Sequence, residues 1–98
     1  MIKISVIRNN NDVDKILIRG HALYDDYGKD IVCASVSSIV ITTVNAILRF
    51  DTESIFVDED DFVIKVLKHN DIVDKLIINM ICLLKELEHD YPDNIKFI

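Results

Sequence analysis

Cysteine is scarce in this chain, and the scarcity limits the chemistry that the chain can support. Its 98 residues include two cysteines, Cys33 and Cys82, which lack the spacing of a zinc site. The N-terminal residues alternate like a strand and show no export signal, so we expect a cytoplasmic protein whose thiols stay reduced. We therefore expect no disulfide, no metal and no cofactor.

Clusters of basic residues are also missing. Eleven basic and seventeen acidic residues give a net charge of −6, and no run of lysine and arginine follows any segment. The electrostatic footprint of nucleic-acid binding is therefore lacking, and we expect no direct nucleic-acid partner. A basic partner fits the overall charge better.

Charge is absent altogether between Ile31 and Leu48. Such a run could suggest a membrane span, but it is of marginal length and is interrupted by serine, threonine and asparagine. We interpret it as a buried helix and expect no membrane partner. With 50% apolar residues and no internal repeat, residues 1–98 are expected to form a single domain.

Hydrophobic periodicity predicts seven elements. Short alternating or β-branched runs predict strands at residues 2–8, 13–21, 54–57, 62–67 and 94–98, whereas helical spacing covers 31–50 and a stretch from 70 or 71 to before Pro92. The order ββαββαβ predicts an α/β (α+β) fold, a two-layer sandwich whose mostly antiparallel sheet carries both helices on one face.

One stretch carries candidate catalytic chemistry. His21 ends the second predicted strand, and Cys33 follows the predicted helix cap Asp30 by three residues. The first turn of a helix stabilises a thiolate, which is the reactive form of cysteine. We therefore predict Cys33 as nucleophile, His21 as general base and first-turn amides as oxyanion donors, with Ser37 one turn beyond Cys33.

Each of these residues also has a structural interpretation. Cys33 could be an inert buried thiol, and Asp30 could cap the helix, orient His21 or do both. Cys82 lies in the apolar run of the second helix, where we expect it to be buried by packing. A redox-sensing role for Cys33 is disfavoured, because no resolving cysteine lies near it in sequence.

The motif resembles the ribosomal-processing cysteine protease (Prp) family of bacteria. The resemblance rests on Gly20-His21-Ala22, Gly28 and the run Asp30-Ile31-Val32-Cys33-Ala34, and extends to Ser37, Thr43-Val44-Asn45 and Tyr91-Pro92. Ser35 stands where the family has alanine, and the acidic turn at 58–61 is atypical.

The resemblance implies a small homodimeric endopeptidase. Such an enzyme removes the N-terminal extension of a large-subunit ribosomal protein, number twenty-seven, so the implied partner is that precursor. By the same resemblance Cys33 is the nucleophile, His21 its partner, and Asp30 and Ser37 supporting residues. Gly20 and Gly28 bracket a loop that closes over substrate. The alternative is a non-enzymatic peptide-binding or ribosome-assembly module.

Overall fold

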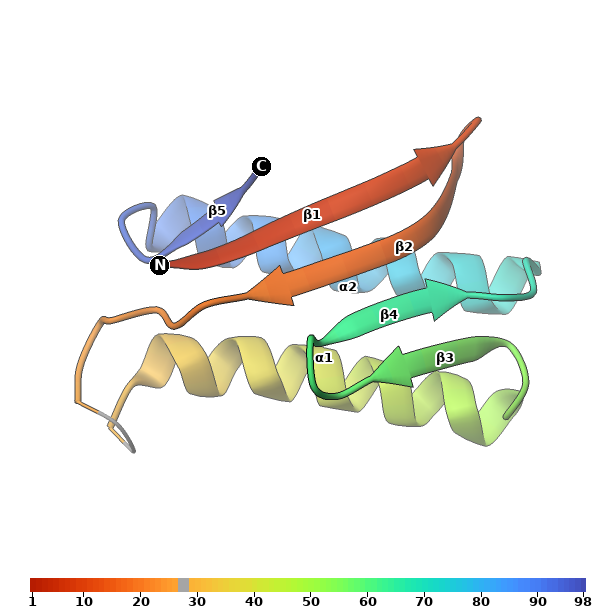
Figure 1. Cartoon of the computed structure of the whole chain (residues 1–98), viewed down its shortest axis with the longest axis horizontal. Helices are drawn as coiled ribbons and strands as arrows, with labels where there is room; N and C mark the ends of the chain where they lie inside the picture. Colours follow the sequence, from red (N-terminus) through yellow and green to blue (C-terminus); the bar gives the residue numbers. More distant parts are fainter. Residues whose placement is uncertain (27–28) are drawn as a thin grey trace.

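The computed structural model describes residues 1–26 and 29–98, which form a two-layer α/β structure (Figure 1). The elements follow one another in the predicted ββαββαβ order. They are β1 (Ile2–Asn9), β2 (Asp12–Arg19), α1 (Ile31–Phe50), β3 (Ile55–Asp58), β4 (Val63–Val66), α2 (Asp71–Asp90) and β5 (Ile95–Phe97). The fold class predicted from the sequence is thus confirmed.

The sheet has the strand order β3-β4-β2-β1-β5. The pairs β1/β2, β2/β4 and β3/β4 are antiparallel, and only β5 lies parallel to its neighbour β1. Both helices cover the same face, and Figure 1 views the molecule from the other, helix-free face. The mostly antiparallel sheet with one covered face therefore agrees with the prediction.

The two helices begin where side-chain oxygens cap them. The Asp30 carboxylate accepts from the backbone N–H groups of Val32 and Cys33, and the Asn70 side chain accepts from Val73. The core lies between the helices and the sheet, and its fully buried side chains include Ile4, Ile16, Ile47, Ile64, Ile77, Met80 and Leu84. This burial outweighs the poor helix propensity of the β-branched residues in α1.

Helix α1 is buried along one stripe only. By length and composition it could cross a membrane, but 28% of its most apolar 18-residue window is buried in the structure, and its inner stripe packs into the core. Ile31 and Ile41 on its outer face, and Phe50 at its C-terminal end, are each about half exposed. The expectation of a buried helix is therefore met on one side of α1.

Two details differ from the predictions. Strand β2 ends at Arg19, so His21 lies in the following loop rather than in the strand. Cys82 is exposed, because it projects from the side of α2 opposite the buried stripe formed by residues such as Met80, Ile81 and Leu84. An apolar neighbourhood in the sequence therefore did not place that thiol in the core.

Candidate active site

Cys33 lies in the first turn of α1, where Asp30 fixes the backbone. Asp30 Oδ1 accepts from the N–H groups of Val32 and Cys33, both at 3.0 Å, and Oδ2 accepts from the N–H of Tyr24, also at 3.0 Å. One carboxylate thus starts the helix and ties down the preceding loop. Asp30 has its capping role, and within residues 1–26 and 29–98 it makes no hydrogen bond to His21.

These hydrogen bonds favour the charged form of Asp30. Burial raises the pKa of the Asp30 carboxyl, but hydrogen bonds from the backbone N–H groups of Cys33 and Tyr24 outweigh burial and hold that pKa below its usual value. Asp30 is therefore an anion at neutral pH.

The sulfur of Cys33 has a backbone donor that the sequence did not reveal. The N–H of Ala22 points to Cys33 Sγ at 3.3 Å, a contact that stabilises negative charge on sulfur. Ala22 is itself held from the other side, because the Asn94 side-chain amide donates to the Ala22 carbonyl oxygen at 2.9 Å. The residue after His21 is thus fixed between α1 and the segment before β5.

Three of the first-turn amides of α1, which were predicted as oxyanion donors, already have acceptors in this structure. The N–H groups of Val32 and Cys33 already donate to the Asp30 carboxylate, and that of Ala34 donates to the Asp30 carbonyl oxygen at 3.1 Å. An oxyanion would have to compete with Asp30 for these three donors. The N–H of Ala22 is the donor nearest the sulfur among the hydrogen bonds of the described residues.

Gly20 turns the chain from β2 toward the site. Its φ of +89° is one that glycine adopts readily, and a Cβ at this position would collide with the Met1 carbonyl oxygen. The turn delivers His21 to the pocket, where its side chain is exposed. Gly28, the other predicted loop glycine, lies outside the described residues.

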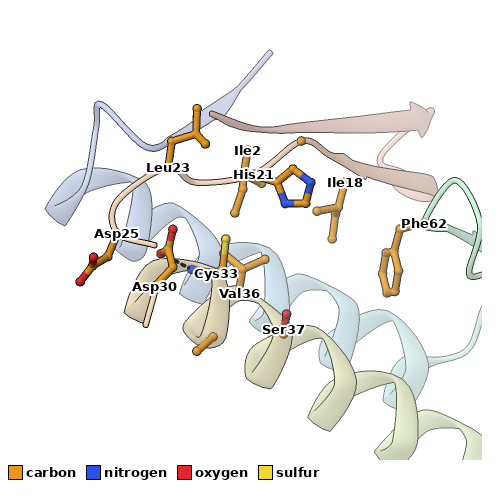
Figure 2. Close-up of a pocket in the computed structure, with 12 residues that line it drawn as sticks. Ile2, Ile18, His21, Leu23, Asp25, Asp30, Cys33, Val36, Ser37 and Phe62 are labelled. Carbon is orange, nitrogen blue, oxygen red and sulfur yellow. Dashed lines mark hydrogen bonds between the residues drawn. The ribbon is translucent and has the colours of Figure 1, made fainter. Parts of the chain in front are cut away.

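The candidate site is a pocket of about 770 Å³ between the end of β2 and the start of α1. His21 and Cys33 line it together, with Asp30 at the helix start and Ser37 one turn along α1 (Figure 2). The apolar walls comprise Ile2, Ile18, Leu23, Val36 and Phe62. Within the described ranges the His21 imidazole makes no hydrogen bond to a protein group.

Backbone strain also gathers at this pocket. Leu23 and Phe62, both lining residues, have positive φ angles of +57° and +39°, which non-glycine residues rarely adopt. Such conformations cost about 1–3 kcal/mol each and persist where surrounding structure imposes them. Tyr24, next to Leu23, packs edge-on against Tyr91 with ring centroids 5.4 Å apart. The loop after His21 is therefore held in an unfavourable conformation by specific contacts.

A second cluster of polar side chains lies at the start of α2, away from the pocket. Ligand atoms of Asp12, His69 and Asp74 lie within 4.8 Å of one another. The His69 ring, however, contacts Asp74 at 2.9 Å and Asp14 at 3.0 Å through its two nitrogens. The hydrogen bond to Asp74 is the main cause that raises the pKa of His69, and that to Asp14 adds to it. Ion pairing of an imidazolium accounts for this cluster.

The structure therefore brings His21, Asp30, Cys33 and Ser37 to one pocket, as the sequence predicted. Sequence reasoning missed Ala22 and Asn94. Asn94 is separated from Ala22 by 72 residues, and its only signal was its place at the start of the predicted last strand, so no local pattern could have linked it to the site.

Comparisons with known sequences point to a single family. The model of a family described as "Cysteine protease Prp" matches residues 1–96. The chain is 40% identical over 101 residues to the ribosomal processing cysteine protease Prp of Mycoplasma pneumoniae, covering 99% of this chain and 93% of that protein. It is 29% identical over 102 residues to the protein of the same name from Staphylococcus aureus (strain Mu50), with coverage of 98% and 96%.

Solved structures are similar over the same length. A crystal structure of an essential ribosomal processing protease Prp from S. aureus, in complex with a covalently linked product peptide, has a TM-score of 0.88 at 30% identity. It covers 99% of this chain and 97% of that one. A second S. aureus Prp structure, in complex with a substrate peptide, has a TM-score of 0.82 at 29% identity, with coverage of 100% and 98%.

Proposed function

Because the chain belongs to the cysteine protease Prp family and is a cysteine protease, we propose that it removes the N-terminal extension of the precursor of large-subunit ribosomal protein twenty-seven. The observation that carries this proposal is that the candidate catalytic groups lie in one pocket. It holds the Cys33 thiol, the His21 imidazole and the Ala22 N–H that points to the sulfur. We place the reaction in the cytoplasm, where ribosomal precursors are made.

The proposed reaction runs through a thioester. Cys33 Sγ attacks the scissile carbonyl carbon while His21 accepts the thiol proton, and His21 then gives that proton to the leaving amine as the C–N bond breaks. Water, activated by His21, hydrolyses the thioester and restores the thiol. Hydrogen bonds between catalytic groups are often long in a free enzyme and shorten when substrate binds. We propose that movement of the loop after His21 brings His21 and Cys33 together in this way.

Ala22 supports the same reaction through its backbone. A donor 3.3 Å from the sulfur lies within reach of the oxygen of a carbonyl that this sulfur attacks. We therefore propose that the Ala22 N–H stabilises the thiolate before attack and the oxyanion after it. Ser37, one turn along α1, is positioned to contact the bound peptide.

The pocket also indicates the kind of peptide. Asp25, Asp30 and Ser37 line it beside the catalytic pair, but most of the other lining residues are apolar, so the pocket favours a segment with apolar side chains before the cut. The net charge of −6 suits a basic precursor, whose mature part follows the cut.

Cleavage of a synthetic peptide spanning the end of the extension tests the proposal. The parent protein and Cys82→Ala should cut it, Cys33→Ala should not, and His21→Ala should be slower by about 100- to 10,000-fold, the usual contribution of a general base. Binding of the peptide without cleavage by the parent would instead indicate a peptide-binding module. Cleavage by Cys33→Ala at the parent rate would refute the assignment of the nucleophile.

We also propose that the protein is a homodimer that pairs through the outer face of α1. On this face Ile31 is 52% exposed and Ile41 is 53% exposed, and no charged residue occurs from 31 to 48. Burial of such apolar surface favours association. In sedimentation measurements the parent should be a dimer and the Ile41→Glu variant a monomer. The Ile78→Glu variant, changed at a similarly exposed site on α2, should stay a dimer. A parent that sediments as a monomer would contradict the proposal.

A further inference from the structure

The helix-free face of the sheet collects basic residues from separate strands. In each strand alternate side chains face the core, as Ile4, Ile16 and Ile64 do, and the residues between them face outward. Five of the eleven basic residues of the chain occupy outward positions. They are Lys3 on β1, Lys15 and Arg19 on β2, Lys65 on β4 and Lys96 on β5. We call this surface the basic face.

Strand register places these charges directly opposite one another. Lys3 pairs with Arg19 on one side and with Lys96 on the other, and Lys15 pairs with Lys65. Like charges that face each other across adjacent strands lower stability. An anionic partner bound to this face would reduce the repulsion between these charges.

The basic face is not neutralised from within. Among residues 1–26 and 29–98 the ion pairs involve Lys68 and His69, and none includes a member of the basic face. Asp58 lies at an outward position at the end of the edge strand β3, and the acidic residues of β2, Asp12 and Asp14, lie beside His69. Physiological salt screens charges that are more than about 8 Å apart, so acidic residues elsewhere on the chain have a weak electrostatic effect at this face.

Exposed apolar side chains lie among the charges. Across the sheet, Ile7, Lys15, Lys65 and Phe56 form one row of paired positions. Phe56 is 52% exposed and Ile7 is 46% exposed. Figure 1 shows that neither helix crosses this face.

Cations that follow a backbone, together with an aromatic ring on which a base stacks, are the features that bind single-stranded nucleic acid. A second copy of this chain would bring like charges together on this face. An acidic peptide would meet the cations but has no base to stack on Phe56. We propose that the basic face binds single-stranded RNA.

This inference goes beyond the proposed function and does not depend on it. The pocket lies on the helix side of the sheet, so RNA on the basic face leaves Cys33 and His21 free. The sequence predicts the opposite, because its basic residues are separated along the chain and meet only through strand pairing.

Fluorescence anisotropy with a labelled twelve-nucleotide RNA of mixed sequence, measured on the full chain from 25 to 200 mM KCl, tests the proposal. Each cation that neutralises a phosphate contributes about −0.7 to the slope of log K against log salt. Five cations give a slope of about −3.5, or about 100-fold weaker binding between 50 and 200 mM salt. The pair Lys15→Gln/Lys65→Gln should weaken binding and make the slope shallower by about 1.4.

Two further variants separate charge from stacking. Phe56→Ser should weaken binding about 5- to 150-fold at fixed salt with an unchanged slope, since it removes one stacking platform. The pair Lys75→Gln/Lys85→Gln on α2 has the same change of net charge and should bind RNA nearly as well as the parent. Circular dichroism checks that each variant is folded, and peptide cleavage should stay at the parent rate.

Three outcomes would overturn the proposal. The parent could fail to bind RNA at 25 mM salt, or the α2 pair could weaken binding as much as the sheet pair. Binding to vesicles of half phosphatidylglycerol or to a polyglutamate peptide, with no binding to RNA, would assign the face to a membrane or to an acidic protein instead. None of these results would bear on peptide cleavage.

Discussion

Asn94 should control the activity of a pocket that it does not line. Its side-chain amide donates to the carbonyl oxygen of Ala22 at 2.9 Å, and the N–H of Ala22 donates to Cys33 Sγ. Ala22 is 1% exposed, so water does not readily replace a lost partner. Asn94 is thus a positioning residue that acts on His21 and Cys33 through Ala22.

The expected magnitude follows from this hydrogen bond. Leaving a buried acceptor without a donor costs about 1–3 kcal/mol. If the catalytic conformation of the loop becomes less stable by this free energy, kcat/KM falls by about 5- to 140-fold. Asn94→Asp keeps the size of the side chain but turns an oxygen toward the Ala22 carbonyl, and Asn94→Ala removes the donor without adding charge. Both variants should lose activity.

The assay combines peptide cleavage with urea unfolding. A positioning role predicts a larger loss in kcat than in KM, together with slower alkylation of Cys33, in variants that are still folded at the assay temperature. Asn79→Asp, at an exposed position of α2, is the matched control and should behave as the parent. If both Asn94 variants keep kcat and the alkylation rate within twofold of the parent, the reasoning is refuted.

Three predictions concern stability, and urea unfolding measures each of them. Gly20→Ala should be strongly destabilising, because a Cβ there meets the Met1 carbonyl oxygen, and parent-like stability would contradict this. Leu84→Ala should cost about 2–5 kcal/mol, since Leu84 is fully buried; a cost below 1 kcal/mol would show that the core adjusts. His69 has a raised pKa, so its ion pairs stabilise the fold below about pH 6.5 and less as pH rises through that raised pKa. His69→Ala should therefore cost about 0.5–1 kcal/mol at pH 6 and little at pH 9; an equal loss at both would exclude titration as the cause.

Local patterns were sufficient for most of the fold. The caps Asp30 and Asn70 and the apolar stripes of α1 and α2 are encoded within a few residues, so periodicity located both helices closely. Cys82 was misplaced because an apolar stretch does not tell which side of a helix meets the core. Strand order was not predictable, since it depends on which hydrophobic faces meet in the folded chain.

The candidate site was predictable only where its residues are neighbours in sequence. His21, Asp30, Cys33 and Ser37 lie within 17 residues, and a strand end followed by a capped helix brings them together. The occupation of the first-turn amides by the Asp30 carboxylate follows from the cap that the sequence did predict, and it competes with the oxyanion role predicted for the same amides. Asn94 and the basic face arise from long-range pairing, which no local pattern contains.

The central claim is that the surroundings of Cys33 make it a nucleophile. Mass spectrometry can follow alkylation of Cys33 and Cys82 by iodoacetamide in one sample at pH 7, with the exposed Cys82 as internal reference. Only about 3% of an ordinary thiol is ionised at this pH. The account predicts that Cys33 reacts about tenfold faster than Cys82 or more, and that His21→Ala removes most of this advantage. Equal rates for the two thiols in the parent, or an advantage that His21→Ala leaves unchanged, would contradict it.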